Sequence, residues 1–407
     1  MKQKQIIVIG AGFGGVRVAL NLAKNQDFSV TIIDQFPHHS VHGQLYEVAT
    51  SPTELTMMPE LKRSVELPLS QIFHNSPVKI VTAKVADINF NSKTVTANKN
   101  YSYDYLVCAL GSQPNFFSIP GANEHALHFS SGYDALKIRG EIESTIAVAK
   151  SDIRKKDIRI VVAGGGVAGV EVAAELQGML NYLAWRENYP RHKIITSIID
   201  RSETILSMFP KEVQEIANQR LEELGVVLDT GVSIESISKQ ELQTNRGVKE
   251  FDILIWAAGV RANPLPTTES ILVKKGDRVE VDAQFRLVGH KEVFVLGDQC
   301  ARIEDGGSNP LPGTASQAIR QANYVASAIN ALAQNQQPQL FACQSLPYLI
   351  PLGPKWAIFY SNKKIVKGYF GYLIRQMVWL KYYISILGFA KGLHWLLRTS
   401  ELFKRND

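Results

Sequence analysis

Residues 158–176 read IRIVVAGGGVAGVEVAAEL, an apolar run that leads through glycines spaced G-x-G-x-x-G into a helical pattern. The chain uses the same pattern near its start, where residues 5–20 read QIIVIGAGFGGVRVAL. In such a turn the first glycine allows the tight bend, the second lets the backbone approach a pyrophosphate, and the third lets helix and strand pack closely. The N-terminus of the helix then faces the phosphates. Two intact turns predict two dinucleotide sites in one chain.

An acidic residue ends the next expected strand after each turn. Asp34 closes the run FSVTIID and Asp200 closes KIITSIID, which is where a carboxylate would bind a ribose hydroxyl. Asp200 predicts a preference for NADH, although Arg201 beside it is compatible with a 2′-phosphate. Two dinucleotides in one protein are most useful as a flavin and a nicotinamide, because hydride can then pass from one ring to the other.

The order of the remaining strands predicts how the two units are connected. The segments YDYLVCALGSQPN and FDILIWAAGVRANP each end a strand in small residues, and EVFVLGDQC adds a late strand that ends at Gly297. We expect an α/β fold in which the first Rossmann-like unit is interrupted by the second and completed by this late strand. The 407 residues also leave room for a small third domain. The expected domains are 1–118 with 279–337 for FAD, 119–278 for NADH, and 338–407 for a C-terminal membrane-associating segment.

Composition excludes several other classes. The chain is 45% apolar and 20% charged, as folded globular proteins are. Its three cysteines have no C-x-x-C spacing, so we expect neither a disulfide framework nor a metal site. Although the opening residues are basic and then apolar, the glycine turn argues against a secretory signal. The net charge of +6 is concentrated after Asp305, with no acidic residue before Glu401, and no nucleic-acid motif accompanies it.

The basic C-terminal segment predicts an amphipathic helix. In MVWLKYYISILGFAKGLHWLL, residues 377–397, a single helix places an aromatic and aliphatic stripe opposite its basic residues, with Ile384 and Trp395 on the polar side. Charged residues break the segment into apolar runs shorter than the ~18 residues that a membrane span needs. We expect this helix to lie on an anionic lipid surface at the cytoplasmic face, as a peripheral anchor. Packing in the core and a homodimer interface are the alternatives. The stripe consists of Trp379, Tyr382, Tyr383, Ile386, Phe389, Ala390, Leu393 and Leu397, and Lys381, Lys391 and Arg398 lie opposite.

Taken together, these features resemble the two-dinucleotide flavoproteins, and among them the type II NADH:quinone oxidoreductases. The stretches that carry the resemblance are GGGVAGVEVAAEL, LYEVAT, WAAGVRANPL, VFVLGD, LPGTASQAIRQA and LGPKWAIF. The resemblance implies hydride transfer from NADH to FAD, and then electron transfer to a membrane quinone without proton pumping. It also implies that Glu171 lies beside the reacting rings and relays a proton.

The resemblance assigns further residues to the three sites. Those implied to contact FAD are Gly10, Gly12, Phe13, Gly14, Gly15, Asp34, Gly111, Gly297, Asp298 and Ala315. Those implied to contact NADH are Gly164, Gly166, Val167, Ala168, Gly169, Asp200 and Gly259. The quinone side is implied to include Ser316, Gln317 and Arg320.

The chain departs from the family pattern on the acceptor side. Ser316 and Arg320 replace the two glutamines of A-Q-x-x-x-Q, and Val41, Gly43 and Gln44 stand where an aromatic, a proline and a leucine are usual. Two other functions therefore remain open. A sulfide:quinone oxidoreductase would use Cys300 and Cys343 beside the flavin. A flavoprotein similar to apoptosis-inducing factor would act mainly as a binding module.

Overall fold

The first glycine turn lies at the end of the central strand of a parallel sheet. The computed structural model describes residues 3–51, 57–151, 157–303, 310–343 and 346–403. The sheet has the order β22–β9–β1–β2–β5, and each pair of neighbours is parallel. The late strand β22 therefore lies beside β9, as the sequence predicts. The strands are β1 (Lys4–Ile9), β2 (Phe28–Asp34), β5 (Lys79–Thr82), β9 (Tyr105–Cys108) and β22 (Val293–Val295).

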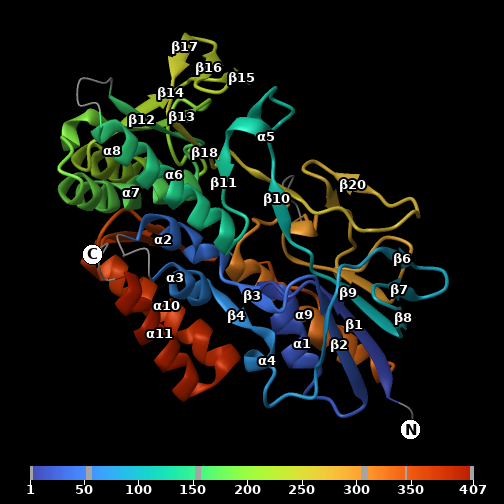
Figure 1. Cartoon of the computed structure of the whole chain (residues 1–407). Coiled ribbons are helices and arrows are strands. Elements are labelled where there is room, and N and C mark those ends of the chain that lie inside the picture. Colours follow the sequence, from blue (N-terminus) through green and yellow to red (C-terminus); the bar gives the residue numbers. More distant parts are fainter. Residues whose placement is uncertain (1–2, 52–56, 152–156, 304–309, 344–345, 404–407) are drawn as a thin grey trace.

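The second glycine turn lies in an equivalent position in a second parallel sheet. Its order is β11–β18–β12–β13–β14, so β12 has the same neighbour pattern as β1 in the first sheet. The two sheets lie in different parts of the molecule, and the chain around β10 (Ser112–Pro114) and β11 connects them (Figure 1). The predicted α/β fold with two Rossmann-like units is therefore confirmed. The strands are β11 (Leu127–His128), β12 (Ile158–Ala163), β13 (Ile194–Asp200), β14 (Val226–Thr230) and β18 (Ile253–Trp256).

Helices follow both glycine turns directly. Helix α1 (Phe13–Leu22) begins after Gly12 and packs against α9 (Ala315–Ala333). Helix α7 (Val167–Arg186) begins after Gly166. The other long helices of the second unit are α6 (Gly132–Lys150) and α8 (Lys211–Glu223).

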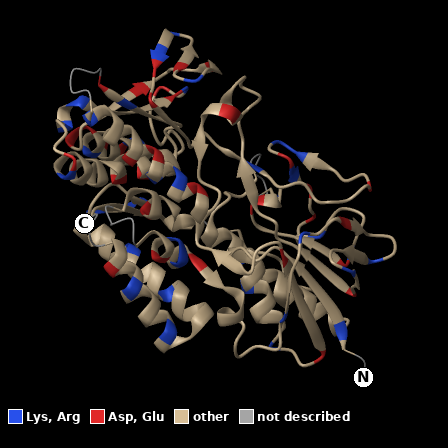
Figure 2. Ribbon diagram, viewed as in Figure 1, with Lys and Arg blue, Asp and Glu red and all other residues tan. Residues whose placement is uncertain are grey.

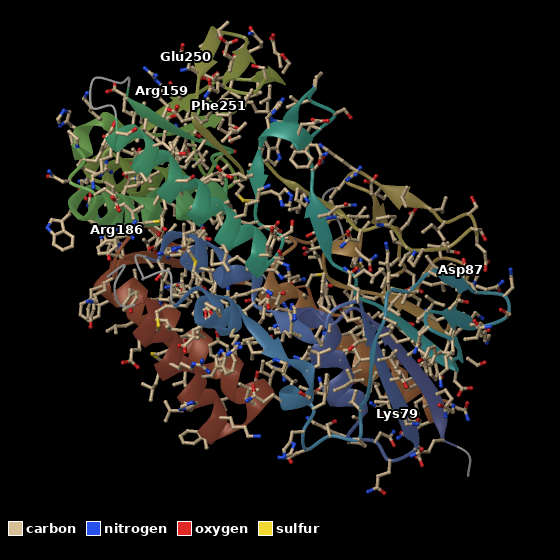
Figure 3. All side chains as sticks on the ribbon, in the orientation of Figure 1. Lys79, Asp87, Arg159, Arg186, Glu250 and Phe251 are labelled. Atoms are coloured by element: carbon tan, nitrogen blue, oxygen red, sulfur yellow. The ribbon has the colours of Figure 1, made fainter. Side chains whose placement is uncertain are left out.

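Short antiparallel sheets extend both units. One contains β15 (Ile234–Ile237), β16 (Glu241–Thr244) and β17 (Gly247–Glu250), and Arg159 of β12 forms a 3.4 Å ion pair with Glu250 at its edge (Figure 3). The others include β6 (Asp87–Asn89), β7 (Thr94–Thr96) and β8 (Asn100–Ser102), together with the pairs β10 (Ser112–Pro114) with β19 (Val260–Ala262), β20 (Val273–Lys274) with β21 (Arg278–Val279), and β3 (His38–Ser40) with β4 (Glu66–Pro68).

Two small helices from the segment before β5 pack against the second unit. The apolar side chains of α2 (Leu45–Thr50) and α3 (Met58–Val65) belong to one buried cluster with residues of α6 and α7. This segment precedes β5 in the chain but shares its core with the second unit. The remaining short elements are η1 (His42–Gln44), α4 (Leu69–Ile72), α5 (Ala122–His125), η3 (Arg191–Lys193) and η4 (Gly297–Gln299).

The C-terminal segment forms two helices, so the prediction of one continuous amphipathic helix is wrong. Helix α10 (Tyr369–Leu387) ends at Gly388, whose φ of +81° interrupts the helix, and α11 (Phe389–Phe403) follows. We call α10 and α11 together the C-terminal hairpin. It follows a three-stranded sheet of β23 (Tyr348–Pro351), β24 (Ala357–Ser361) and β25 (Lys364–Gly368).

The break changes which side chains are buried. Tyr382, Tyr383 and Ile386 pack into the core of the first unit, whereas Phe389, Leu393 and Leu397 of the expected stripe are exposed. Trp395, expected on the polar side, is buried. These differences arise because the helical period of α10 does not continue across Gly388.

Candidate active site

The two glycine turns have nearly identical geometry. An added Cβ at Gly15 would lie 1.8 Å from the carbonyl oxygen of Gly10, and one at Gly169 would lie 1.8 Å from that of Gly164. Only glycine therefore allows each helix to approach its strand this closely. At Gly12, by contrast, an added Cβ would have no neighbouring atom within 4 Å. The same is true of Gly166.

This open space suits a phosphate group. Neither α1 nor α7 has a side chain that caps its N-terminus, and neither has an acidic residue in its first turn. The first backbone N–H groups of both helices therefore face the open space with their positive end. The residues present at each turn fit a dinucleotide pyrophosphate.

The strand-ending aspartates are bonded to both turns in the same way. Asp34 Oδ2 accepts the N–H of Ala11 at 2.6 Å, and Asp200 Oδ2 accepts the N–H of Gly165 at 2.6 Å. The second oxygen of each carboxylate accepts an N–H from two residues further along the chain. Burial raises the pKa of Asp34, and these two N–H bonds oppose the shift. Each oxygen keeps a lone pair for a ribose hydroxyl.

Other predicted flavin residues meet near the ends of β9 and β22. Asp298 Oδ2 accepts the hydroxyl of Ser112 at 2.6 Å. The N–H of Gly297 donates to Gln321 Oε1 at 2.7 Å, which ties this turn to α9. Gly111 adopts a positive φ of +69° just after β9. The structure therefore brings these residues to the same edge of the sheet as the first glycine turn.

The remaining members of the glycine motifs have distinct surroundings. Phe13 packs against the rings of both His39 and Tyr382, each with its centroid 5.0 Å away. An added Cβ at Gly14 would contact the side chain of Leu296. At the second turn Ala168 is exposed and Val167 half-buried. Gly259 faces the ring of Phe117.

Glu171 lies on α7 two residues beyond the second glycine turn. Burial raises the pKa of its carboxyl group well above the ordinary value, and the charge of Glu175 one turn later adds to the shift. Both carboxyl groups also raise the pKa of Tyr46, after the larger effect of burial. The shift favours the protonated form, so Glu171 keeps its proton to a higher pH than an ordinary glutamate does.

Opposite these carboxyl groups lies a buried ion pair that the sequence interpretation missed. Arg375 of α10 donates to Glu47 and, at 2.6 Å, to the hydroxyl of Tyr46. A cavity of ≈ 20 Å³ borders this pair and Glu175, which is room for about one water molecule. The sequence did contain an indication of this pair. Arg375 is the only arginine in its apolar helical segment and Glu47 is the only acid in LYEVAT, and each needs a partner if it is buried.

The three predicted acceptor-side residues lie at the start of α9 in different surroundings. Ala315 begins the helix, which Thr314 caps through the N–H of Gln317 at 3.2 Å. Ser316 is exposed and Gln317 is buried. Arg320 donates to the carbonyl of Ala342 at 2.5 Å and lies over the ring of Phe341, 5.2 Å from its centroid.

Two parallel sheets in one chain, each presenting an uncapped helix N-terminus, define the class of two-dinucleotide oxidoreductases. The chain belongs to the pyridine nucleotide-disulphide oxidoreductase family, whose model matches residues 4–322. It is 29% identical over 349 residues to the type II NADH:quinone oxidoreductase of Staphylococcus haemolyticus, covering 82% of this chain and 84% of that protein. The type II NADH:quinone oxidoreductase of Staphylococcus aureus (strain COL) is 27% identical over 83% of this chain and 85% of its own length. The predicted resemblance is thereby confirmed.

Solved structures share the fold. NDH2 from Plasmodium falciparum in complex with NADH has a TM-score of 0.85 at 17% identity, covering 99% of both chains. The sulfide:quinone oxidoreductase from Aquifex aeolicus has a TM-score of 0.77 at 17% identity, covering 95% of this chain and 91% of that one. At these identities the likeness concerns the arrangement of the elements.

Proposed function

We propose that this protein is a type II NADH:quinone oxidoreductase with FAD at the first glycine turn and NADH at the second. The observation that carries the proposal is the matched geometry of the two turns, with the aspartates and the open glycine position in the same place. When bound, the flavin accepts a hydride from NADH and passes two electrons to a quinone. The chain supplies the phosphate-binding N–H groups, the ribose-binding carboxylates and a proton at Glu171.

A direct experiment is anaerobic reduction of the purified protein. We expect a flavin absorbance spectrum that NADH bleaches within seconds and that a soluble ubiquinone or menaquinone analogue restores. NADPH should give a lower kcat/KM, because Asp200 accepts bonds from a 2′-hydroxyl and repels a 2′-phosphate. Gly12→Val places a branched side chain in the open phosphate position and should abolish flavin binding. Full flavin absorbance in this variant would contradict the assignment of the first turn.

The two other functions make different predictions. A binding module would oxidise NADH slowly whatever quinone is supplied. A sulfide:quinone oxidoreductase needs a reactive thiol, but burial raises the pKa of Cys300 to about 12, which keeps this thiol protonated and poorly nucleophilic. Sulfide should therefore leave the flavin oxidised under conditions in which NADH bleaches it.

On the acceptor side we propose that Arg320 borders the quinone. Its guanidinium would place a permanent positive charge where a neutral glutamine is usual, next to the quinone oxygens. Arg320→Gln should change the rate of quinone reduction several-fold and leave anaerobic reduction by NADH unchanged. Ser316→Gln provides a second test of the same site. If both variants reduce quinone at the rate of the wild type, neither position borders the quinone.

We further propose that the C-terminal hairpin holds the protein against the cytoplasmic face of a membrane. Within the described residues no helix is both long and apolar enough to cross a bilayer. The hairpin nevertheless exposes large apolar side chains beside its basic ones, and acidic residues are nearly absent from it (Figure 2). This combination suits a helix pair that lies in an anionic lipid surface. The exposed apolar residues are Tyr369, Phe370, Leu373, Met377, Val378, Phe389, Leu393 and Leu397.

A further inference from the structure

The middle residue of the first glycine turn, Ala11, is held through both of its backbone polar groups. The N–H of Ala11 donates to Asp34 at 2.6 Å, and its carbonyl oxygen lies 2.8 Å from His39 Nδ1. Because the peptide bond is planar and trans, the N–H of Gly12 points opposite to the carbonyl of Ala11. A bond from His39 therefore sets the direction of the Gly12 N–H at the start of α1.

The second turn contains the same contact with a different donor. The carbonyl of Gly165, which corresponds to Ala11, accepts the backbone N–H of Leu206 at 2.7 Å. In both turns the donor comes from the segment that follows the strand-ending aspartate. The second turn uses a backbone group whose proton is fixed, whereas the first uses an imidazole whose proton can sit on either nitrogen.

The carbonyl of Ala11 can only accept, so its contact with His39 Nδ1 places the ring proton on that nitrogen, and a residue of the C-terminal hairpin faces the other one. Burial lowers the pKa of His39 to about 4, so the ring is neutral near pH 7 and has one donor and one acceptor nitrogen. The hydroxyl of Tyr382 lies 2.7 Å from His39 Nε2. With that proton on Nδ1, Nε2 is an acceptor, so Tyr382 donates its hydroxyl to Nε2 and stabilises this tautomer. Both side chains are buried, and Phe13 packs against both rings.

We propose that His39 and Tyr382 are positioning residues for the flavin, which aim the Gly12 N–H at its pyrophosphate. This inference rests on the proposed assignment of FAD to the first turn. It makes α10 part of the flavin site, although α10 follows the glycine turn by more than 350 residues. A second contact joins α10 to the helix that follows the first glycine turn, since Arg17 of α1 donates to the hydroxyl of Ser385 at 2.5 Å.

The test is flavin affinity in four variants of the full chain. Apoprotein is titrated with FAD, and binding is followed by the quenching of flavin fluorescence. His39→Leu and Tyr382→Phe should raise the Kd for FAD about three- to tenfold, the equivalent of one neutral hydrogen bond. His39→Asn retains a donor near the position of Nδ1 and should bind FAD within about twofold of the wild type.

The matched control is Tyr383→Phe. Tyr383 is the next residue, is also buried, and donates its hydroxyl to Gln44 Oε1 at 2.5 Å. Its loss should lower thermal stability much as Tyr382→Phe does, but leave the Kd for FAD unchanged. The Kd for NADH should be unchanged in all four variants, because the second turn depends on the N–H of Leu206.

A spectroscopic measurement tests the tautomer itself. With ¹⁵N-labelled histidine, the wild type should show a proton on Nδ1 of His39, identified by the signals that vanish in His39→Asn. In Tyr382→Phe the proton should stay on Nδ1, and the Nε2 resonance should shift because that nitrogen has lost its hydrogen-bond donor. Equal Kd values for FAD in Tyr382→Phe and Tyr383→Phe, or a wild-type proton on Nε2, would overturn the inference. A wild type that binds no FAD would instead contradict the proposed function.

Discussion

At the scale of single residues, Glu171 and Glu175 show how burial sets chemistry. The two carboxyl groups are one helical turn apart on α7 and therefore share a face. Burial raises the pKa of Glu171 first, and the neighbouring negative charge raises it further. A raised native pKa means that ionisation of Glu171 weakens the folded state.

Glu171→Gln tests this effect on stability. Because the native pKa exceeds the unfolded one, Glu171 costs nothing below the unfolded pKa, and its cost grows as the pH rises toward the native pKa. We expect the variant to match the wild type in thermal stability near pH 4 and to exceed it at higher pH, by an amount that grows as the pH rises above the unfolded pKa. A constant difference across this range, measured by calorimetry, would show that Glu171 ionises normally.

His39 gives a pH dependence of the opposite kind. Its pKa falls from 6.5 in the unfolded chain to about 4 in the native protein, so the unfolded chain binds more protons between these values. Its contribution is complete above pH 6.5 and is lost as the pH falls through 4. Protonation of His39 in the unfolded chain should lower the free energy of unfolding by about 2 kcal/mol as the pH falls from 7 to 5. His39→Asn should lose correspondingly less between these pH values in urea titrations, and an unchanged loss would contradict the buried neutral imidazole.

At the scale of elements, glycines decide the shape of the C-terminal hairpin. Gly388 ends α10 with a positive φ, and Gly392 lets α11 approach α10 closely. An added Cβ at Gly392 would lie 2.6 Å from the backbone nitrogen of Ile384. The two helices therefore cannot stay packed in this way with any larger residue at position 392.

Gly392→Ala should separate the helices and destabilise the protein by about 1–3 kcal/mol, the usual cost of overpacking. Gly140→Ala is the matched control, since Gly140 also lies within a helix but an added Cβ there meets no atom within 4 Å. That change should instead stabilise the protein by up to about 1 kcal/mol, because alanine favours a helix. Both values come from denaturant midpoints, and a neutral Gly392→Ala would contradict the close approach.

These elements also show what the sequence can and cannot predict. The glycine turns are local patterns, so the strand, the turn, the helix and the late strand β22 could all be predicted from short segments. The contact between His39 and Tyr382 could not, because it joins residues that are distant in the chain through a fold in which neither forms a motif. The break at Gly388 was visible as a glycine, but the apolar period on either side suggested a single helix.

At the scale of the whole molecule, the hairpin has two different faces. One face carries Tyr382 and Arg375 into the interior, where Tyr382 contacts His39 and Arg375 contacts Glu47 of α2. The other exposes apolar and basic side chains. A surface that holds the outer face would therefore also hold the helix that contacts His39, so the proposed membrane attachment would be connected directly to the proposed flavin site.

Vesicle binding tests the outer face. Phe370 and Phe389 are 70% and 71% exposed, and burying a phenylalanine in lipid is worth roughly 1.5–3 kcal/mol. Phe370→Ser with Phe389→Ser should therefore lower partitioning onto phosphatidylglycerol vesicles at least tenfold in a sedimentation assay. Val248→Ser is the control, because Val248 is 56% exposed in β17, far from α11 (Figure 1).

The salt dependence of vesicle binding distinguishes the electrostatic contribution of the hairpin from its apolar contribution. The attraction of its lysines and arginines, on the order of 1 kcal/mol each near an anionic surface, should fall as the ionic strength rises. The contribution of the phenylalanines should persist. Lys381→Gln with Lys391→Gln should consequently flatten the salt dependence, whereas the phenylalanine pair should lower binding at every salt concentration. If both pairs and the control partition as the wild type does, the exposed face of the hairpin does not contact lipid, and a contact between two copies of this chain becomes the explanation of its apolar surface.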